Sequence, residues 1–221
     1  MGDHPTSATT SPREERRRIR VETTRSQILD AAEHAFATAG FHNTTIKSIA
    51  EQCEIAVGTF YVLFEDKKSL YEAVLRRRGD ELKALMDAKV SAPQSEATTL
   101  VELAELQIGY FRQHPDWTTV ASALVSGSRA AATGEPVRLY EPGHRIVASA
   151  IAAVIAQGQR NGHIRSGNPA ALALIYLGML ETFHRIDAAD TMAESNYSLD
   201  EFLELIGATF NPTSPGQKRR N

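Results

Sequence analysis

The sequence has very little cysteine and no long apolar run. Its 221 residues include one cysteine, Cys53, which excludes an intrachain disulfide framework and favours a reducing compartment. The longest stretch without a charged residue, 166–180, is shorter than the roughly 20 residues that span a bilayer. The polar, arginine-rich first segment lacks the apolar stretch of a signal peptide. We therefore expect a soluble, cytoplasmic protein that makes no membrane contact.

The sequence also lacks the short motifs that mark common catalytic and metal sites. It contains no Gly-x-Ser-x-Gly elbow, no P-loop, no His-Glu-x-x-His and no paired cysteines. Its seven histidines show no metal-ligand spacing. We expect neither an enzyme nor a bound cofactor or metal.

Acidic residues slightly outnumber basic ones, and the formal net charge of −3 argues mildly against nucleic acid. The basic residues are clustered, however, in the first segment and at the end of the chain. The clusters comprise Arg13, Arg16, Arg17, Arg18, Arg20, Arg25, Lys218, Arg219 and Arg220. Such clusters either contact phosphates or lipid headgroups, or form solvated ends. Composition predicts a disordered basic arm at residues 1–20 and a flexible basic tail at 212–221.

Helix signals begin directly after the predicted arm. Thr24 and Gln27 form a capping box, and apolar residues then recur at helical spacing until Gly40, which ends the helix. Thr44 or Thr45 caps a second, short helix. The spacing thus predicts a long helix followed closely by a short one.

A third short helix and a long fourth helix follow. After a break near Glu54, the third carries Phe60 and Phe64, which we assign to a small core. Asp66 caps the fourth helix, which extends to about residue 89.

The rest of the chain also predicts helices, because no run alternates apolar and polar residues as a strand would. Helices are expected at 100–112, from Pro115, at 146–159, at 169–185 behind Asn168, and from Ser198, with a loop at 134–143. The predicted fold is all-α with about nine helices. The predicted domains are a DNA-binding domain at 21–80 and an effector-binding and dimerisation domain at 81–211.

Two short helices with a third bracing them form a helix-turn-helix unit, whose second short helix can enter the DNA major groove. Residues 24–71 resemble the N-terminal domain of the tetracycline-repressor (TetR) family. The resemblance lies in ILDAAEHAFATAG at 28–40 and TTIKSIAEQCEIAVGTFYVLFEDKKSLY at 44–71. The remainder of the chain resembles the family only in architecture.

Residues at the starts of three helices are the candidate DNA contacts. Gly58 lets the backbone approach the duplex, and Thr59 suits a phosphate, a base edge or a thymine methyl. Tyr61 can donate to a phosphate, or could instead be core. Lys67 and Lys68 can grip a phosphate at a helix start, or could simply be solvated. The candidates are Thr45, Val57, Gly58, Thr59, Tyr61, Lys67 and Lys68.

Some positions depart from the family pattern. Glu54 stands where the family usually has glycine, so the turn is expected to be reshaped. Val57 replaces a common lysine or polar residue and favours apolar contact with thymine methyls. Val62 and Leu63 remove possible phosphate donors. Cys53 is interpreted as a small buried hydrophobe, with a redox sensor as the alternative.

The C-terminal part suggests an interface and an effector site. The helix at 169–185 is apolar around nearly its whole circumference, so either a partner subunit or its own subunit must cover it. The family resemblance implies a homodimer in which two C-terminal helices of each subunit form a four-helix interface. A surplus of aromatic and polar residues could line a ligand pocket or belong to the core. These residues are Tyr110, Phe111, Trp117, Tyr140, His144, Tyr176, Met179, Phe183 and His184.

The resulting hypothesis is a ligand-responsive regulator, more specifically a repressor. It would bind a double-stranded DNA operator with inverted-repeat symmetry as a homodimer, and a small-molecule effector would release it. The fourth helix would carry the signal between the two domains. The alternative is an all-helical ligand-binding or scaffolding protein whose helix-turn-helix no longer binds DNA.

Overall fold

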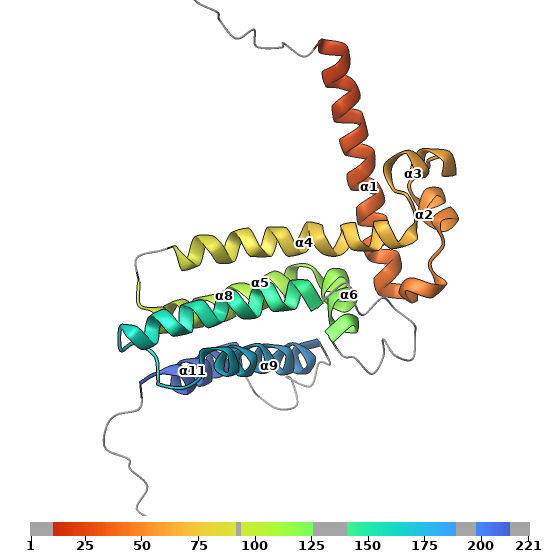
Figure 1. Cartoon of the computed structure of the whole chain (residues 1–221). Helices are drawn as coiled ribbons and strands as arrows, with labels where there is room; N and C mark the ends of the chain where they lie inside the picture. Colours follow the sequence, from red (N-terminus) through yellow and green to blue (C-terminus); the bar gives the residue numbers. More distant parts are fainter. Residues whose placement is uncertain (1–10, 92–93, 126–140, 189–197, 213–221) are drawn as a thin grey trace, which may run out of the picture. The chain divides into compact units, whose positions relative to one another are not determined.

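The computed structural model describes residues 11–91, 94–125, 141–188 and 198–212. This part of the chain forms nine helices and no strand (Figure 1), which confirms the predicted all-α class. The helices are α1 (Pro12–Asn43), α2 (Ile46–Gln52), α3 (Val57–Leu63), α4 (Lys67–Val90), α5 (Glu96–Gln113), α6 (Pro115–Val125), α8 (Glu141–Arg160), α9 (Pro169–Ala188) and α11 (Leu199–Phe210). Within the described ranges no helix is both long and apolar enough to cross a membrane.

The chain divides into two compact units between Leu75 and Arg76. The sequence predicts this boundary after residue 80, a few residues further along the same helix. Helix α4 therefore belongs to both units, with residues 67–75 in the first and the rest in the second.

The first unit is built from α1, α2, α3 and the start of α4 around a small core. Its buried side chains are Ile28, Leu29, Ala31, Ala32, Phe36, Ile49, Ala50, Phe60, Phe64, Leu70, Tyr71 and Val74. Phe36 and Tyr71 meet edge to face with their ring centroids 5.0 Å apart, an arrangement that aromatic rings favour. As predicted, Phe60 and Phe64 belong to this core.

Residues 12–20 are helical, so the predicted disordered arm is wrong for this stretch. The helix begins at a capping box of Ser11 and Glu14, with Pro12 at its first position, and not at Thr24. The Glu14 amide donates to the Ser11 hydroxyl, and the Ser11 amide donates to the Glu14 carboxylate. The composition hid this signal because the segment has almost nothing to bury, whereas its local caps stabilise a helix without packing.

The other caps follow the sequence closely. Thr45 caps α2, and Ser198 caps α11 through a capping box with Glu201. Asp66 accepts from the Ser69 amide at the start of α4 (2.6 Å), and Asn168 accepts from the Ala170 amide at the start of α9 (2.9 Å). These predicted helix starts are confirmed.

The predicted loop at 134–143 is wrong at its end, because α8 begins at Glu141. Pro142 and Gly143 suggested a loop, yet proline is tolerated in the first turn of a helix, where its missing amide has no intrahelical acceptor. Residues 126–140 lie outside the described part of the chain.

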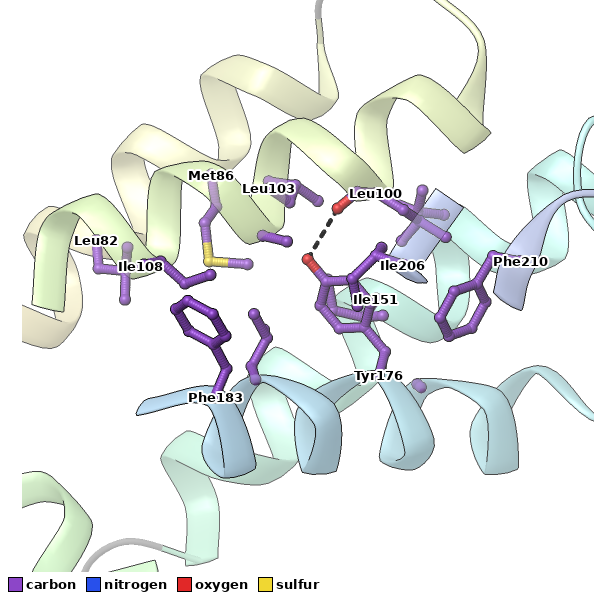
Figure 2. Close-up of a cluster of buried hydrophobic side chains, with 14 of the residues drawn as sticks. Leu82, Met86, Leu100, Leu103, Ile108, Ile151, Tyr176, Phe183, Ile206 and Phe210 are labelled. Carbon is purple, nitrogen blue, oxygen red and sulfur yellow. Dashed lines mark hydrogen bonds between the residues drawn. The ribbon is translucent and has the colours of Figure 1, made fainter. Parts of the chain in front are cut away.

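The second unit has a larger apolar core to which α4, α5, α6, α8, α9 and α11 contribute. Figure 2 shows Leu82, Met86, Leu103 and Phe183 converging in it, with Tyr176 among them. The Tyr176 hydroxyl donates to the Leu100 carbonyl over 3.0 Å, so the buried phenol has a partner.

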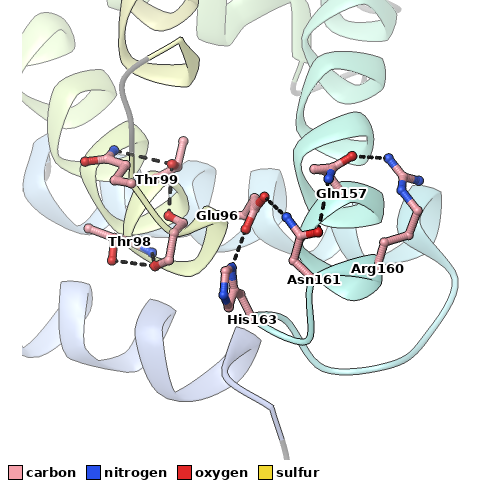
Figure 3. A network of polar contacts seen from close by, with 9 residues as sticks. Glu96, Thr98, Thr99, Gln157, Arg160, Asn161 and His163 are labelled. Carbon is pink, nitrogen blue, oxygen red and sulfur yellow. Dashed lines mark hydrogen bonds and ion pairs between the residues drawn. The ribbon is translucent and has the colours of Figure 1, made fainter.

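A polar network joins the start of α5 to the turn after α8 (Figure 3). The Glu96 carboxylate accepts from Asn161 Nδ2 and lies 2.6 Å from His163 Nδ1. These hydrogen bonds lower the pKa of Glu96, with His163 as the main cause. A Cβ at Gly158 would lie 2.6 Å from the Ile164 side chain and 2.8 Å from Glu96 Cβ, so α8 and α5 approach closely here only because residue 158 is glycine.

Candidate nucleic-acid interface and effector site

Helix α3 has one buried side and one exposed side. Phe60 is completely buried and anchors the helix in the first unit. Val57 and Tyr61 are 40% and 55% exposed, Val62 is 80% exposed, and Thr59 is exposed as well. Tyr61 is therefore not a core residue. Four of the predicted DNA contacts, Val57, Gly58, Thr59 and Tyr61, lie at accessible positions of a seven-residue helix.

Gly58 is not required by packing within its own unit. A Cβ at this position would meet nothing within 4 Å, and no left-handed backbone requires glycine there. Glycine also weakens a helix interior by roughly 0.5–1 kcal/mol relative to alanine. Glycine at position 58 would have a physical reason if a binding partner approached the helix backbone closely there.

The start of α2 is exposed and tightly capped. The Thr45 hydroxyl accepts from the Ser48 amide over 3.0 Å, and the Ser48 hydroxyl accepts from the Thr45 amide over 3.3 Å. Thr45 therefore fixes the start of the helix while its side chain stays exposed. Lys47, one residue into α2, is also exposed, and its ammonium lies 3.7 Å from the Glu51 carboxylate.

The structure gives Lys67 a role that the sequence did not predict. Its ammonium donates to the carbonyls of Phe41 (2.7 Å), His42 (3.3 Å) and Thr44 (2.9 Å). It also lies 4.5 Å from the centroid of the Phe41 ring. A lysine has three N–H donors, so these carbonyls occupy all of them. Lys67 closes the end of α1 onto the start of α4, and we do not propose it as a phosphate contact.

Lys68 is different from its neighbour. Its side chain is 57% exposed, and its ammonium lies 3.8 Å from the Glu72 carboxylate, an i,i+4 pair on the helix surface. Exposed pairs of this kind contribute little and exchange easily for another anion. Lys68 therefore stays a candidate phosphate contact.

The turn between α2 and α3 contains a non-glycine residue with positive φ, Glu54. Glu54 has a φ of 54°, the left-handed region in which non-glycine residues are strained. Beside it, Cys53 is half-buried and its thiol donates weakly to the Gln27 carbonyl at 3.6 Å. Burial, and secondarily Asp30, raise the pKa of Cys53, which favours an unreactive thiol over a redox sensor.

In the second unit, α5, α6 and α9 bring several of the predicted effector residues together. Phe111 stacks on Trp117 with ring centroids 5.3 Å apart, and it also meets the His184 ring at 4.2 Å. Tyr110 meets Trp117 edge to face at 5.8 Å. We call these four residues, Tyr110, Phe111, Trp117 and His184, the aromatic cluster.

Two polar atoms of the aromatic cluster are buried without a hydrogen-bond partner. They are the indole Nε1 of Trp117 and the Nε2 of His184, and no described residue pairs with either. Burial lowers the pKa of His184 to about 4, so its imidazole is neutral near pH 7. Buried polar groups are nearly always satisfied, so these two atoms are candidate positions for a polar partner outside the described residues.

Tyr110 connects the aromatic cluster to α4. Its phenol donates to the Glu81 carboxylate over 2.7 Å and lies 3.2 Å from the Arg78 carbonyl. Burial, reinforced by the bond to Glu81, raises the pKa of Tyr110. Glu81 and Arg78 were not singled out in the sequence, because their contact with Tyr110 joins residues about 30 positions apart.

The remaining predicted effector residues are not part of the aromatic cluster. Tyr176 and Phe183 are fully buried in the core of the second unit, to which Tyr110 and Trp117 also belong, and Met179 is half-buried against it. Their surroundings are those of ordinary core residues. Tyr140 lies outside the described residues, and so does the side chain of His144.

Helices α8 and α9 leave exposed faces that contain apolar and small residues. On α9, Leu174 and Ile175 are 56% and 50% exposed, and no described atom lies within 4 Å of where a Cβ of Gly178 would be. On α8, Ile146 is 55% exposed. The two helices pack against each other, so these faces belong to one helix pair.

The sequence matches the family model "Bacterial regulatory proteins, tetR family" over residues 28–74. The regulator UidR of Escherichia coli K12 is 40% identical over 52 residues, which cover 24% of this chain and 26% of UidR. TtgR of Pseudomonas putida is 38% identical over 73 residues, or 33% of each chain. The chain thus matches about a quarter to a third of the length of these curated relatives.

Solved structures match over most of the chain. A protein from Saccharomonospora viridis in complex with choline has a TM-score of 0.69 at 23% identity, over 85% of this chain and 95% of its own. The ketosteroid transcriptional regulator KstR2 of Mycobacterium tuberculosis has a TM-score of 0.65 at 18% identity, over 85% and 94%. At these identities the likeness concerns the fold. The curated relatives UidR and TtgR and the structural neighbour KstR2 are all named as regulators.

Proposed function

We propose that this chain, a transcriptional regulator of the TetR family with a helix-turn-helix domain, is a ligand-responsive repressor. It binds an inverted-repeat operator as a homodimer, and a small-molecule effector releases it. The observation that carries the proposal is α3, which is anchored by Phe60 and presents Val57, Thr59 and Tyr61 outward. This is the arrangement by which a recognition helix reaches base edges.

The exposed residues of α3 and of the neighbouring helix starts fall into two groups, those suited to base edges and those suited to phosphates. Val57 and Thr59 suit base edges and thymine methyls, and so determine sequence preference. Tyr61, Thr45 and Lys68 suit phosphate oxygens, and so add affinity without base information.

The alternative is an all-helical ligand-binding or scaffolding protein that does not bind DNA. The exposed Val57 and Val62, where polar groups would serve DNA better, favour it. A gel shift with the DNA that flanks the protein's own gene separates the two functions. A discrete complex that weakens with salt supports the repressor, whereas smearing without a discrete complex supports the alternative.

The effector site of the proposal is the aromatic cluster. The buried Trp117 Nε1 donor needs an acceptor, and the neutral His184 Nε2 needs a polar partner. An uncharged molecule with a carbonyl and a hydroxyl, and with an apolar part that stacks on Phe111, would satisfy both. The choline bound by the S. viridis protein shows that a structural neighbour holds a small molecule.

The release mechanism runs through Tyr110. Its phenol bonds to Glu81 and to the Arg78 carbonyl in the part of α4 that belongs to the second unit. An effector that moves the cluster would therefore shift α4, whose first residues belong to the DNA-binding unit. Linkage requires that effector and operator weaken each other's binding by the same factor, typically about 5–150-fold.

Reciprocal binding measurements test this mechanism. An effector is first found by thermal-shift screening of uncharged metabolites, and its affinity is then measured with and without operator. The mechanism predicts weaker effector binding in the presence of operator, and Tyr110→Phe should reduce that difference. Equal affinities in both conditions would show that the cluster does not control DNA binding.

A further inference from the structure

Helix α1 extends well beyond the part that packs. Its 32 residues begin at Pro12, whereas the first buried residue is Ile28. None of the residues 12–27 is buried. Local bonds maintain this extension, including the cap at Ser11 and an ion pair between Glu15 and Arg18 at 2.8 Å. Because none of its side chains is buried, this segment has surface available to a partner.

Four arginines of the extension lie on one side of the helix. Arg13, Arg16, Arg17 and Arg20 follow the spacing i, i+3, i+4, i+7, which places them within one face of about 100°. All are exposed, and no ion pair involves them among the described residues. We call these four residues the arginine face.

The acidic residues of the extension lie on other sides and are largely engaged. Glu14 completes the cap with Ser11, and Glu15 pairs with Arg18. Glu22 follows Glu15 by seven residues, or about two turns, and therefore shares its side. The positive charge of the arginine face is consequently not neutralised by its own helix.

We propose that the arginine face binds backbone phosphates of the DNA duplex that α3 reads. The inference rests on the DNA-binding function proposed above and adds a second contact surface to it. From Arg13 to Arg20 the helix rises about 10 Å, a length along which each DNA strand presents about three phosphates. Guanidinium groups are well suited to phosphate oxygens because they can donate two parallel hydrogen bonds.

Contacts within the first unit fix where the extension starts. The Arg25 guanidinium lies 4.6 Å from the centroid of Phe64, the residue that ends α3, and the Gln27 carbonyl accepts from Cys53 after α2. Arg20 is five residues, about 7.5 Å along the axis, from Arg25. The arginine face thus begins close to the helix-turn-helix.

The same surface does not suit a membrane. Helices that lie on bilayers combine basic residues with a continuous apolar face. The exposed apolar residues here, Ile19 and Val21, are two positions apart and so lie about 160° from each other, on nearly opposite sides of the helix. Neither forms an apolar face with the arginines, and the charge pattern favours a nucleic acid.

The test compares DNA binding by the full chain and by the R13A/R16A/R17A/R20A variant. The probe is a duplex that the unmodified chain enriches from a random-sequence library, titrated over a range of salt concentrations. We expect the variant's Kd to rise about tenfold or more, and its salt slope to become shallower by about 0.9 for each phosphate that it no longer binds. The sequence preference should not change, because phosphate contacts carry no base information.

Two controls separate charge from folding. Arg18→Ala removes an arginine from another side of the same helix and should leave the Kd and the salt slope unchanged. The variant with lysine at all four positions keeps the charge and should retain most of the slope. Circular dichroism checks that the helix persists, which alanine favours.

Each outcome has a distinct meaning. If the unmodified chain selects a sequence and the alanine variant binds it with the same Kd and slope, the arginine face is not a DNA contact, although the proposed function stands. A variant that loses binding only to anionic phosphatidylglycerol vesicles would also overturn the proposal. If the unmodified chain selects no sequence, the proposed function fails and this inference fails with it.

Discussion

Phe60 and Tyr61 are neighbours in α3 with opposite environments, since one is completely buried and the other is 55% exposed. The sequence places both in a short helix but does not say which side faces the core. That side is set by contacts with residues far along the chain. At the scale of single residues, exposure therefore separates the residues that hold α3 from those that are free to contact DNA.

Gly58→Ala should separate stability from DNA binding. No atom lies within 4 Å of the new Cβ, so the helix should gain roughly 0.5–1 kcal/mol in the free energy of unfolding. The same methyl group should hinder close approach to the duplex and raise the Kd about tenfold. Urea unfolding and fluorescence anisotropy with operator DNA measure the two effects.

Gly79→Ala is the matched control for this substitution. Gly79 also lies in a helix with nothing within 4 Å of a new Cβ, and it is not among the candidate DNA contacts. It should show a similar gain in stability with an unchanged Kd. If Gly58→Ala left DNA binding unchanged, the close approach of α3 to DNA would be wrong.

His184 should make the protein sensitive to mild acid. Burial lowers its pKa to about 4 from an ordinary value of 6.5, so between these values the unfolded chain binds more protons than the folded one. The free energy of unfolding therefore falls as the pH falls through this window. We expect His184 to account for a loss of about 2 kcal/mol between pH 7 and pH 5.

The variant His184→Leu should lose less stability over the same pH range, as measured by urea unfolding at both values. Asp187 nearby, whose pKa is lowered chiefly by its hydrogen bond to Arg112, loses its contribution at lower pH in both proteins. An equal loss in the two proteins would mean that His184 is not held neutral by burial.

At the scale of helices, most boundaries were predictable because caps are local. A helix start can be recognised from the three or four residues around its cap, as at Thr45, Asp66, Asn168 and Ser198. Ser11 and Glu14 form the same kind of capping box at the start of α1. The predicted start lies too late in the sequence, because the polar composition of residues 1–20 predicts disorder. The partners of Lys67 were not predictable, since its carbonyl acceptors lie 23–26 residues away in sequence.

The effector site was predictable only in part for the same reason. Tyr110, Phe111 and Trp117 were selected as aromatic residues in apolar helices, and the structure joins them. Tyr176 and Phe183 satisfied the same criterion and share the core with Tyr110 and Trp117, but neither has an unpaired buried polar atom among the described residues. A sequence shows which residues are aromatic, but burial and unpaired polar atoms depend on how the helices pack.

Replacement by methionine should lower the stability of the protein at Lys67 but hardly change it at Lys68. Lys67→Met leaves the carbonyls of Phe41, His42 and Thr44 without their donor, and should lower the free energy of unfolding by about 1–3 kcal/mol. Lys68→Met should change it by less than about 0.5 kcal/mol. For DNA binding, Lys68→Met removes one proposed phosphate contact and should make the salt slope shallower by about 0.9.

Urea unfolding and salt titration of DNA binding, carried out on both variants, check this pair. The two residues are adjacent and chemically identical, so each variant is the control for the other. If Lys67→Met were as stable as the unmodified protein, its role at the end of α1 would be wrong.

At the scale of the whole molecule, the proposed homodimer depends on the helix pair α8 and α9. Gly178→Leu adds a bulky side chain where no described atom of the subunit lies within 4 Å of the new Cβ. It should therefore leave the fold of the subunit intact and shift the protein from dimer to monomer in sedimentation velocity at micromolar concentration. Gly178→Ala, a much smaller addition, should remain largely dimeric. A monomeric unmodified protein would contradict the dimer itself.

Whether α3 reads a DNA sequence is decided by selection from a random duplex library with the unmodified chain. We expect enrichment of an inverted repeat whose half-sites are about 10 base pairs apart from centre to centre, or a multiple of that spacing. With Thr59→Val, the enriched bases should change within each half-site while the spacing stays the same. If no sequence is enriched after selection by the unmodified chain, α3 does not read a DNA sequence.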